Sequence, residues 1–194
     1  FVCTPSKFHI DEAIWLAKNN INIFVEKPLG DSFRNLDKLK NLLRKKSNLK
    51  HMMGYQLKFN PIILKLEDLL SKKIIGDIYY LDIHHGEHIN DFHPYEDYKH
   101  SYAAKKSLGG GVVLTQIHEI DYMLFLFDKY KIVTKSYISR KVSDLQIDVE
   151  DTLSAQFIMR DGKRNLICQL HTNFYEKPKR RQINIIGKKG KIFC

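Results

Sequence analysis

The sequence has few cysteines and no long apolar run. Its three cysteines, Cys3, Cys168 and Cys194, are widely spaced and odd in number. This spacing matches neither a disulfide framework nor a metal site, so we expect a reducing, cytoplasmic setting. No apolar run approaches the roughly 18 residues that span a bilayer, and the first residues carry no signal-peptide pattern. We therefore expect a globular protein with no membrane partner.

An initiating methionine and the phosphate-binding pattern G-x-G-x-x-G are also missing. The chain begins at Phe1-Val2-Cys3-Thr4 and ends at Lys191-Ile192-Phe193-Cys194, and both runs are typical of strand interiors. We therefore expect a fragment that is cut at both ends.

Apolar residues make up 43% of the chain and aromatic residues 11%, which suits a globular protein with a core. The net charge is +10, and seven basic residues lie between Lys177 and Lys191 with no acid among them. A basic chain can bind nucleic acid. No recognition motif or regular aromatic interleaving accompanies the charge, so we expect no nucleic-acid partner and favour solvated faces or an anionic small ligand.

Strand and helix patterns alternate in the first part of the chain. Apolar runs predict strands at 1–4, 21–25 and 50–55, and helical spacing predicts helices at 9–18 and from Ser32, as N-cap, to about Lys46. This order predicts a parallel sheet with right-handed crossovers. We interpret residues 1–57 as the C-terminal part of a Rossmann doubly wound parallel sheet that lacks the Gly-rich loop.

The remaining residues, 58–194, follow another pattern. We expect a helix after Asn60-Pro61, a strand at 78–85, a long aromatic-rich segment at 86–108 and a helix at 112–127. Strand patterns then follow at 131–140, 151–159, 164–171, 181–186 and 191–194, with a hairpin turn at Asp161-Gly162. Consecutive strands behind helices predict an α+β domain with a mostly antiparallel sheet, so the fold class is α/β.

Lys27 stands at the exit of the second strand, within Glu26-Lys27-Pro28. Loops at the carboxyl ends of strands are where open α/β sheets bind ligands. A partly desolvated lysine loses its proton more easily, so it can bond a substrate hydroxyl and share in its deprotonation. The simpler alternative is a solvated loop lysine.

His118 lies on the predicted helix that follows Gly109-Gly110-Gly111. Histidine titrates near neutral pH and suits proton transfer to a hydroxyl or carbonyl oxygen. The alternative is a helix histidine that Asp121 or the backbone satisfies. The three glycines favour the functional interpretation, because they let the backbone approach a ligand closely.

The segment 90–98 mixes aromatic rings with carboxylates and amides, which suits a sugar-like ligand. Its candidate substrate-binding residues are His93, Tyr95 and Tyr98. A surface loop packed by its own aromatics is an equal alternative. The histidines of this region have no distinctive spacing, so we expect no metal.

Several motifs together resemble the glucose–fructose oxidoreductase / inositol dehydrogenase / rhizopine-catabolism (Gfo/Idh/MocA) family of NAD(P)-dependent oxidoreductases. They are Thr4-Pro5-Ser6-Lys7-Phe8-His9, Glu26-Lys27-Pro28, Gly54 to Pro61, and Gly109-Gly110-Gly111 followed by His118-x-x-Asp121. Their order and spacing cover most of the chain. The resemblance implies a Rossmann domain followed by an α/β domain with a large antiparallel sheet, through which members form homodimers or homotetramers.

The resemblance also implies roles for single residues. The cofactor, NAD or NADP, would lie along Thr4, Pro5, His9, Glu26, Lys27 and Gln56. Lys27 would stand at the hydroxyl of the reacting carbon, near the nicotinamide, and His118 would transfer the proton. The substrate would meet Lys27, His93, Tyr95, Tyr98, Thr115 and His118.

The sequence departs from the family at two points. The Gly-rich loop is absent, so we expect this chain alone to bind cofactor poorly or not at all and to be inactive. Many family dehydrogenases have an aspartate four residues before the histidine, where this chain has Leu114. His118 would then be oriented by Asp121 or Thr115, or another group would do the proton work.

The first hypothesis is therefore an oxidoreductase that transfers a hydride between NAD(P) and a secondary alcohol carbon of a sugar, cyclitol or nucleotide-sugar-like substrate. The second is a non-catalytic protein of the same fold that binds a sugar or a partner. Substrate, direction and the choice between NAD and NADP stay open, because the residues that select the cofactor precede Phe1 in this family.

Overall fold

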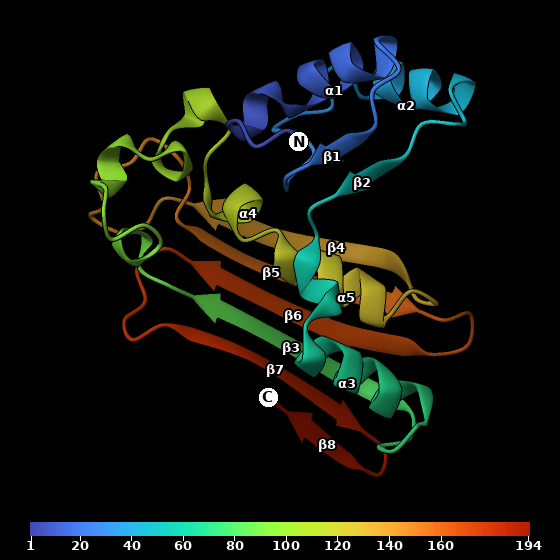
Figure 1. Cartoon of the computed structure of the whole chain (residues 1–194). Helices are drawn as coiled ribbons and strands as arrows, with labels where there is room; N and C mark the ends of the chain where they lie inside the picture. Colours follow the sequence, from blue (N-terminus) through green and yellow to red (C-terminus); the bar gives the residue numbers. More distant parts are fainter.

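The computed structural model describes residues 1–194 and contains two separate buried cores. The smaller core has nine buried residues, which run along the sequence from Val2 to Leu49. The larger has 22, from Ile63 to Ile185. The chain therefore crosses once from one core to the other, between Leu49 and Ile63 (Figure 1).

The N-terminal part is a small parallel sheet with helices. It contains η1 (Ser6–Phe8), α1 (His9–Lys18), β1 (Ile23–Val25), α2 (Leu36–Lys45) and β2 (His51–Met53). β1 pairs with β2 in parallel, and Val2 joins β1 through a parallel bridge to Val25. The parallel arrangement predicted for this half is confirmed, although the expected first strand is reduced to that single bridge.

The start of α2 differs from the prediction. The helix begins at Leu36 rather than after Ser32, because Asn35 adopts a left-handed conformation with φ 61°. The Asn35 side chain donates a hydrogen bond of 2.7 Å to Asp11 of α1, which ties the helix start to its neighbour. Phe33, which falls within the predicted helix, lies before α2 and is 89% exposed.

The C-terminal part is a six-stranded sheet with helices. In chain order it contains η2 (Gln56–Phe59), α3 (Pro61–Ser71), β3 (Ile78–Gly86), the short helices η3 (Ile89–Asp91), η4 (Tyr98–His100), η5 (Tyr102–Ala104) and η6 (Lys106–Leu108), α4 (Val112–Thr115), α5 (His118–Leu126), β4 (Lys131–Arg140), β5 (Thr152–Arg160), β6 (Asn165–Asn173), β7 (Arg180–Gly187) and β8 (Gly190–Phe193). The Asn60 side chain caps α3 by accepting from the Ile62 N–H at 2.9 Å.

The large sheet has the order β4-β5-β6-β3-β7-β8, and every neighbouring pair is antiparallel except β3 and β6. Helices α3, α4 and α5 cover one face, and no helix covers the other (Figure 1). The burial pattern of β3 reflects this difference between the two faces. Leu81, Ile83 and His85 are buried under the helices. The residues that alternate with them, Tyr80, Asp82 and His84, point to the other face and are half-buried.

The prediction of one continuous helix at 112–127 is wrong. The structure has two helices, α4 and α5, which are separated at Gln116 and Ile117. Gln116 leaves the helical conformation with φ −99° and ψ 33°, and its buried side chain donates to the main-chain oxygen of Asn173 at 3.1 Å. The break makes His118 the first residue of α5.

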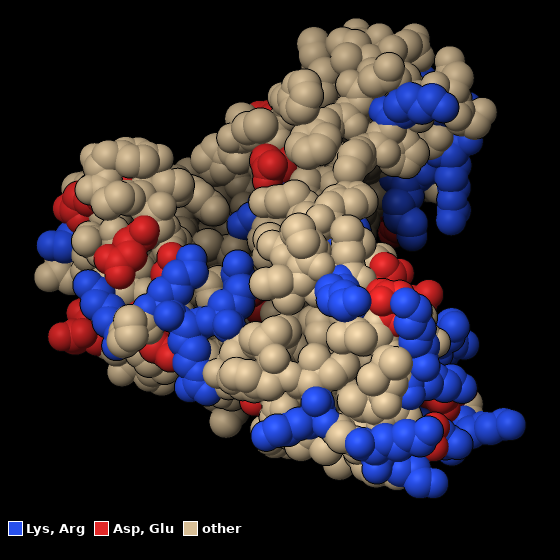
Figure 2. All heavy atoms as spheres, turned by 60° about the horizontal axis from the view of Figure 1, so that its bottom comes forward, with Lys and Arg blue, Asp and Glu red and all other residues tan.

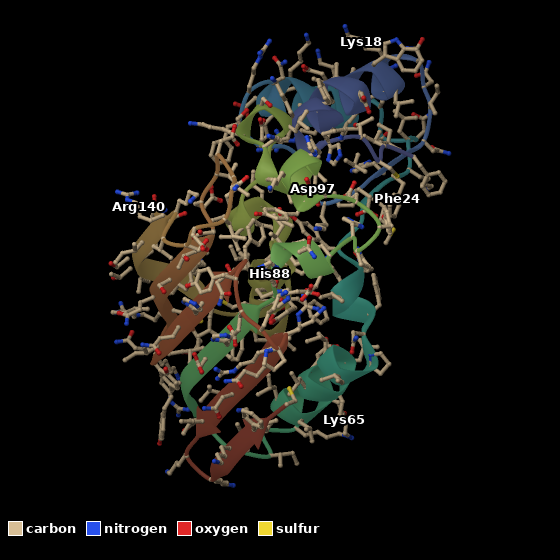
Figure 3. All side chains as sticks on the ribbon, turned by 90° about the vertical axis from the view of Figure 1, so that its left-hand side faces the viewer. Lys18, Phe24, Lys65, His88, Asp97 and Arg140 are labelled. Carbon is tan, nitrogen blue, oxygen red and sulfur yellow. The ribbon has the colours of Figure 1, made fainter.

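The long segment between β3 and α4 is ordered by packing. Ile89, Ala103 and Ala104 belong to the larger core, and the Phe92 ring meets Phe174 edge-on at 5.5 Å. In Figure 3 His88 lies near the sheet and Asp97 lies closer to the N-terminal part. The segment therefore covers the end of the sheet that faces the smaller core.

The three consecutive glycines join segments of the protein. A Cβ at Gly109 would lie 3.1 Å from the Lys7 nitrogen and 2.9 Å from Asp31 Cβ. A Cβ at Gly110 would lie 2.5 Å from the carbonyl oxygens of Tyr102 and Ala103. These glycines therefore have a packing role at the junction of the two parts, and their approach to a ligand stays a prediction.

Basic side chains form several groups on the face shown in Figure 2, with acidic side chains among them. Ion pairs join some basic and acidic side chains of the chain, such as Lys179 with Glu87 at 2.8 Å and Lys177 with Asp91 at 3.7 Å. None of the helices combines the length and the apolar character that crossing a membrane requires.

Replacement of Gly110 by alanine is expected to destabilise the protein by about 1–3 kcal/mol, because the added methyl group meets two main-chain oxygens that cannot retreat. Chemical denaturation measures the loss. Ser107→Ala, at an exposed position of the same segment, serves as the control, and equal stability of the two variants would contradict the packing role.

Candidate active site

Lys27 follows directly from β1 and reaches across to the C-terminal part. Val25 ends the strand, and the Lys27 Nζ donates a hydrogen bond of 2.7 Å to the main-chain oxygen of Thr115, at the end of α4. The side chain is half-buried. The simpler alternative, a loop lysine that only contacts solvent, is therefore wrong.

The surroundings of Lys27 lower the pKa of its side chain. Burial is the main influence and lowers the pKa of Lys27 below the usual lysine value, while the negative charges of Glu26 and Glu119 oppose it. The Glu26 carboxylate also accepts from the Lys27 main-chain N–H at 3.2 Å. Lys27 thus gives up its proton more readily than a lysine in water.

His118 lies at the start of α5 and is 7% exposed. Its Nδ1 is buried without a hydrogen-bond partner, and the Tyr55 ring meets it edge-on at 6.2 Å. Burial first, and then the positive charge of Lys27, lower the pKa of His118 to about 4. The imidazole is therefore neutral at neutral pH and able to accept a proton.

The two residues that we expected to orient His118 form no hydrogen bond with it, although the Thr115 hydroxyl and Asp121 Oδ2 are buried without a partner. Asp121 forms an ion pair of 3.4 Å with Lys58, whose ammonium also lies 5.5 Å from the centre of the Tyr55 ring. The main-chain oxygen of Thr115 is occupied by Lys27. Neither residue has a hydrogen bond to His118, so its direction is set by the position of α5.

Leu114 lines an open cleft of about 550 Å³ between the two parts of the chain. Five of its nine lining residues are charged. Besides Leu114, the lining residues are Asp31, Lys106, Gly109, Gly110, Lys141, Asp148, Val149 and Glu150. Because position 114 is a leucine, it supplies no carboxylate that could contact His118.

The residues expected along the cofactor divide into two groups. Thr4 and Gln56 are exposed, and Pro5 and Glu26 are half-buried. His9 is 1% exposed, and its ring nitrogens lie 2.6 Å from the main-chain oxygens of Thr4 and Pro28. Both nitrogens of His9 are thus used to join the two loops.

The turn at Gly54 is shaped around Glu26. A Cβ at Gly54 would lie 2.8 Å from Glu26 Oε1, so only glycine lets the carboxylate pack there. Thr4, Glu26 and Gln56 all lie at the carboxyl ends of the parallel strands, where this kind of sheet binds a dinucleotide. The residues present fit the nicotinamide half of such a cofactor.

His93, Tyr95 and Tyr98 of the long segment contact other residues than Lys27 and His118. The Tyr95 hydroxyl contacts Nδ1 of His93 at 2.9 Å, and Tyr95 is 82% exposed. The Tyr98 hydroxyl accepts from the Gln146 main-chain N–H at 3.3 Å. Their role in substrate binding stays a prediction.

Sequence reasoning missed a buried ionic cluster beside His118. Glu119 is fully buried, and its Oε1 lies 2.9 Å from Arg181 Nε and 3.0 Å from His85 Nδ1. Burial raises the pKa of Glu119, but the contacts with His85 and Arg181 outweigh burial and lower it overall. One signal was available: His85 occupies an inward position of β3, alternating with Leu81 and Ile83.

A parallel α/β half with a lysine at a strand exit, followed by a sheet domain that supplies a histidine, defines a dinucleotide-dependent oxidoreductase fold. The chain belongs to the GFO/IDH/MocA oxidoreductase family. Residues 1–55 match the oxidoreductase family model with an NAD-binding Rossmann fold, and residues 63–193 match the GFO/IDH/MocA C-terminal domain.

Two curated relatives match parts of the chain. An uncharacterized oxidoreductase of Streptococcus pneumoniae serotype 4 is 27% identical over 127 residues, which are 64% of this chain and 32% of that protein. The trans-1,2-dihydrobenzene-1,2-diol dehydrogenase of Xenopus tropicalis is 32% identical over 106 residues, which are 55% of this chain and 29% of that protein.

Among solved structures, myo-inositol 2-dehydrogenase from Lactobacillus plantarum superposes with a TM-score of 0.83 at 20% identity. The match covers 100% of this chain and 56% of that chain. This likeness confirms the fold class. The chain thus spans about half the length of that structure and matches about a third of each curated relative.

Stability is expected to depend on pH through His118. Its pKa is about 4 in the folded state and near 6.5 in the unfolded chain. The unfolded state therefore binds the extra proton first, and the free energy of unfolding falls as the pH drops from about 6.5 toward 4. Denaturation at several pH values should show a shallower dependence for His118→Gln.

His100→Gln is the control for this measurement, because the His100 side chain is 83% exposed. An unchanged pH dependence in His118→Gln would show that His118 titrates as it does in the unfolded chain.

Proposed function

We propose that the protein containing this chain is an NAD(P)-dependent dehydrogenase acting on a secondary alcohol carbon. The observation that carries the proposal is the meeting of Lys27 Nζ with the end of α4, next to a neutral, unpartnered His118. A hydrogen-bond donor and a proton acceptor at one place suit the removal of a proton from a hydroxyl.

The bound nicotinamide supplies the hydride chemistry. Thr4, Glu26 and Gln56 hold its end of the cofactor at the strand exits. Lys27 donates a hydrogen bond to the substrate oxygen and stabilises the negative charge that develops there. The neutral His118 takes the hydroxyl proton, and in the reverse direction it returns the proton to the carbonyl oxygen.

We propose a sugar, cyclitol or nucleotide-sugar-like substrate. The family membership supports a polyol, and the five charged residues among the nine that line the cleft at Leu114 support a hydroxyl-rich ligand. His93, Tyr95 and Tyr98 would contact parts of the substrate that lie farther from the reacting carbon. Three unpaired cysteines support a reducing, cytoplasmic setting.

Lys27→Ala in the complete protein is expected to lower kcat by orders of magnitude, about 10²–10⁴-fold, because the donor at the reacting oxygen is lost. The affinity for the dinucleotide should change little. Steady-state kinetics and cofactor titration by fluorescence measure the two quantities. Lys58→Ala is the comparison, since Lys58 pairs with Asp121 at the edge of the site.

Turnover retained in Lys27→Ala would remove Lys27 from the mechanism. Tight binding of a sugar without any NAD(P)-dependent turnover in the wild-type protein would favour a non-catalytic sugar-binding role on the same fold. The 194-residue chain by itself is expected to show no turnover, because it contains no G-x-G-x-x-G phosphate-binding pattern.

We also propose that the uncovered face of the large sheet binds a second copy of the chain. Apolar side chains lie exposed on this face: Ile138 is 66%, Ile167 51% and Ile186 38% exposed. No helix lies over them (Figures 1 and 3). A homodimer or homotetramer would remove this surface from water.

Ile167→Asp is expected to shift the assembly toward monomers, which light scattering after size-exclusion chromatography would detect. Ile62→Asp on α3, where Ile62 is 56% exposed, serves as the control and should leave the assembly unchanged. An Ile167→Asp protein with the wild-type mass would contradict the proposed interface.

A further inference from the structure

Glu119 is the one fully buried carboxylate directly beside the proposed proton acceptor. It is the second residue of α5, next to His118 in sequence, and its exposure is 0%. Burying a charged carboxylate costs several kcal/mol unless partners compensate it. A buried carboxylate at this position therefore indicates a role that an apolar side chain could not fill.

Its partners come from two neighbouring strands of the sheet. Arg181 of β7 and His85 of β3 stand opposite each other in the sheet register, and both contact Glu119 Oε1, at 2.9 Å and 3.0 Å. The Arg181 side chain also approaches His85 Nδ1 at 3.1 Å. Glu119 thus fixes the first turn of α5 to the middle strands of the sheet.

This attachment matters because His118 has no hydrogen bond of its own. Its Nδ1 is unpartnered, Asp121 is paired with Lys58, and Leu114 offers no carboxylate. The direction of the imidazole therefore depends on where the first turn of α5 is held. Glu119 is the side chain in that turn whose contacts hold it.

Charge gives Glu119 a second effect on the site. Its negative charge raises the pKa of both Lys27 and His118, against burial, which lowers both. The titratable and charged groups that face this cluster come from several elements. They are Glu26 and Lys27 after β1, Tyr55 after β2, His85 and Glu87 at the end of β3, His118 and Tyr122 of α5, and Arg181 of β7.

We propose that Glu119 is a positioning residue of the active site, which holds the start of α5 against His85 and Arg181 and thereby directs His118 toward the substrate hydroxyl next to Lys27. Its carboxylate also balances the positive charge of Lys27, together with Glu26. This inference rests on the proposed dehydrogenase function.

The test compares Glu119→Gln with the wild type in the complete protein. The amide keeps the size of the side chain and removes its charge. We expect kcat to fall by about 100-fold, as for a misplacement of about 1 Å, while KM for NAD(P) stays the same. We also expect the acid limb of the pH profile of kcat/KM to move to lower pH, because Lys27 and Arg181 then act on His118 unopposed.

Glu87→Gln is the matched control. Glu87 contacts the outer side of His85, at 3.4 Å from Nε2, and pairs with Lys179, so its amide variant should keep the wild-type kcat and pH profile. Glu119→Asp keeps the charge, and it should retain the position of the acid limb even if kcat falls. A Glu119→Gln protein with wild-type kcat and pH profile would overturn the proposal.

If Glu119→Gln does not fold, Arg181→Lys replaces it. Lysine keeps the positive charge but cannot bond both Glu119 and His85 as the guanidinium does, so kcat should fall while the acid limb stays in place. Wild-type kcat in Arg181→Lys would overturn the proposal.

A wild-type protein without any NAD(P)-dependent turnover would instead refute the proposed function. In that case nitrogen NMR of the His118 ring tests the inference by itself. A shifted titration of His118 in Glu119→Gln, with none in Glu87→Gln, supports the positioning role, and identical titrations in all three proteins overturn it.

Discussion

The bond from Lys27 Nζ to the main-chain oxygen of Thr115 connects the two cores through the residue proposed to do the chemistry. Lys27 lies in the loop after strand β1 of the parallel sheet, and Thr115 ends α4 in the helical layer over the large sheet. Because the bond is made to a main-chain atom, it fixes the lysine relative to α4 whatever side chain stands at 115. The geometry of the site therefore depends on how the two parts are docked.

The docking itself relies on close backbone packing. Gly109 lies against Lys7 and Asp31 of the N-terminal part, and Gly110 lies against two carbonyl oxygens of its own part. His9 adds a link within the N-terminal part by joining the Thr4 and Pro28 loops. Main-chain contacts of this kind have little freedom to adjust, so they hold the lysine more rigidly than side-chain packing alone would.

Local sequence patterns predicted most of the elements and not their arrangement. Strands β4 to β8 and helix α1 were predicted to within a residue or two, because alternation and helical spacing are strong there. The start of α2 and the break between α4 and α5 were not, since Asn35 and Gln116 are held by partners distant in sequence. Lys27 and His118 were identifiable from their place on a strand exit and a helix. Glu119, His85 and Arg181 were not, because their association depends on the register of β3 and β7.

The place of β3 has a consequence for how the chain is made. β3 lies between β6 and β7, both of which follow it late in the sequence, and it pairs with neither β4 nor β5. During synthesis β3 leaves the ribosome with both edges unpaired, while β4 and β5 can already form a hairpin. Non-local pairing of this kind closes slowly and exposes strand edges meanwhile. The central strand of the large sheet is thus among the last to gain its hydrogen-bonded neighbours. A chain that stops before β6 would leave both edges of β3 without a partner strand.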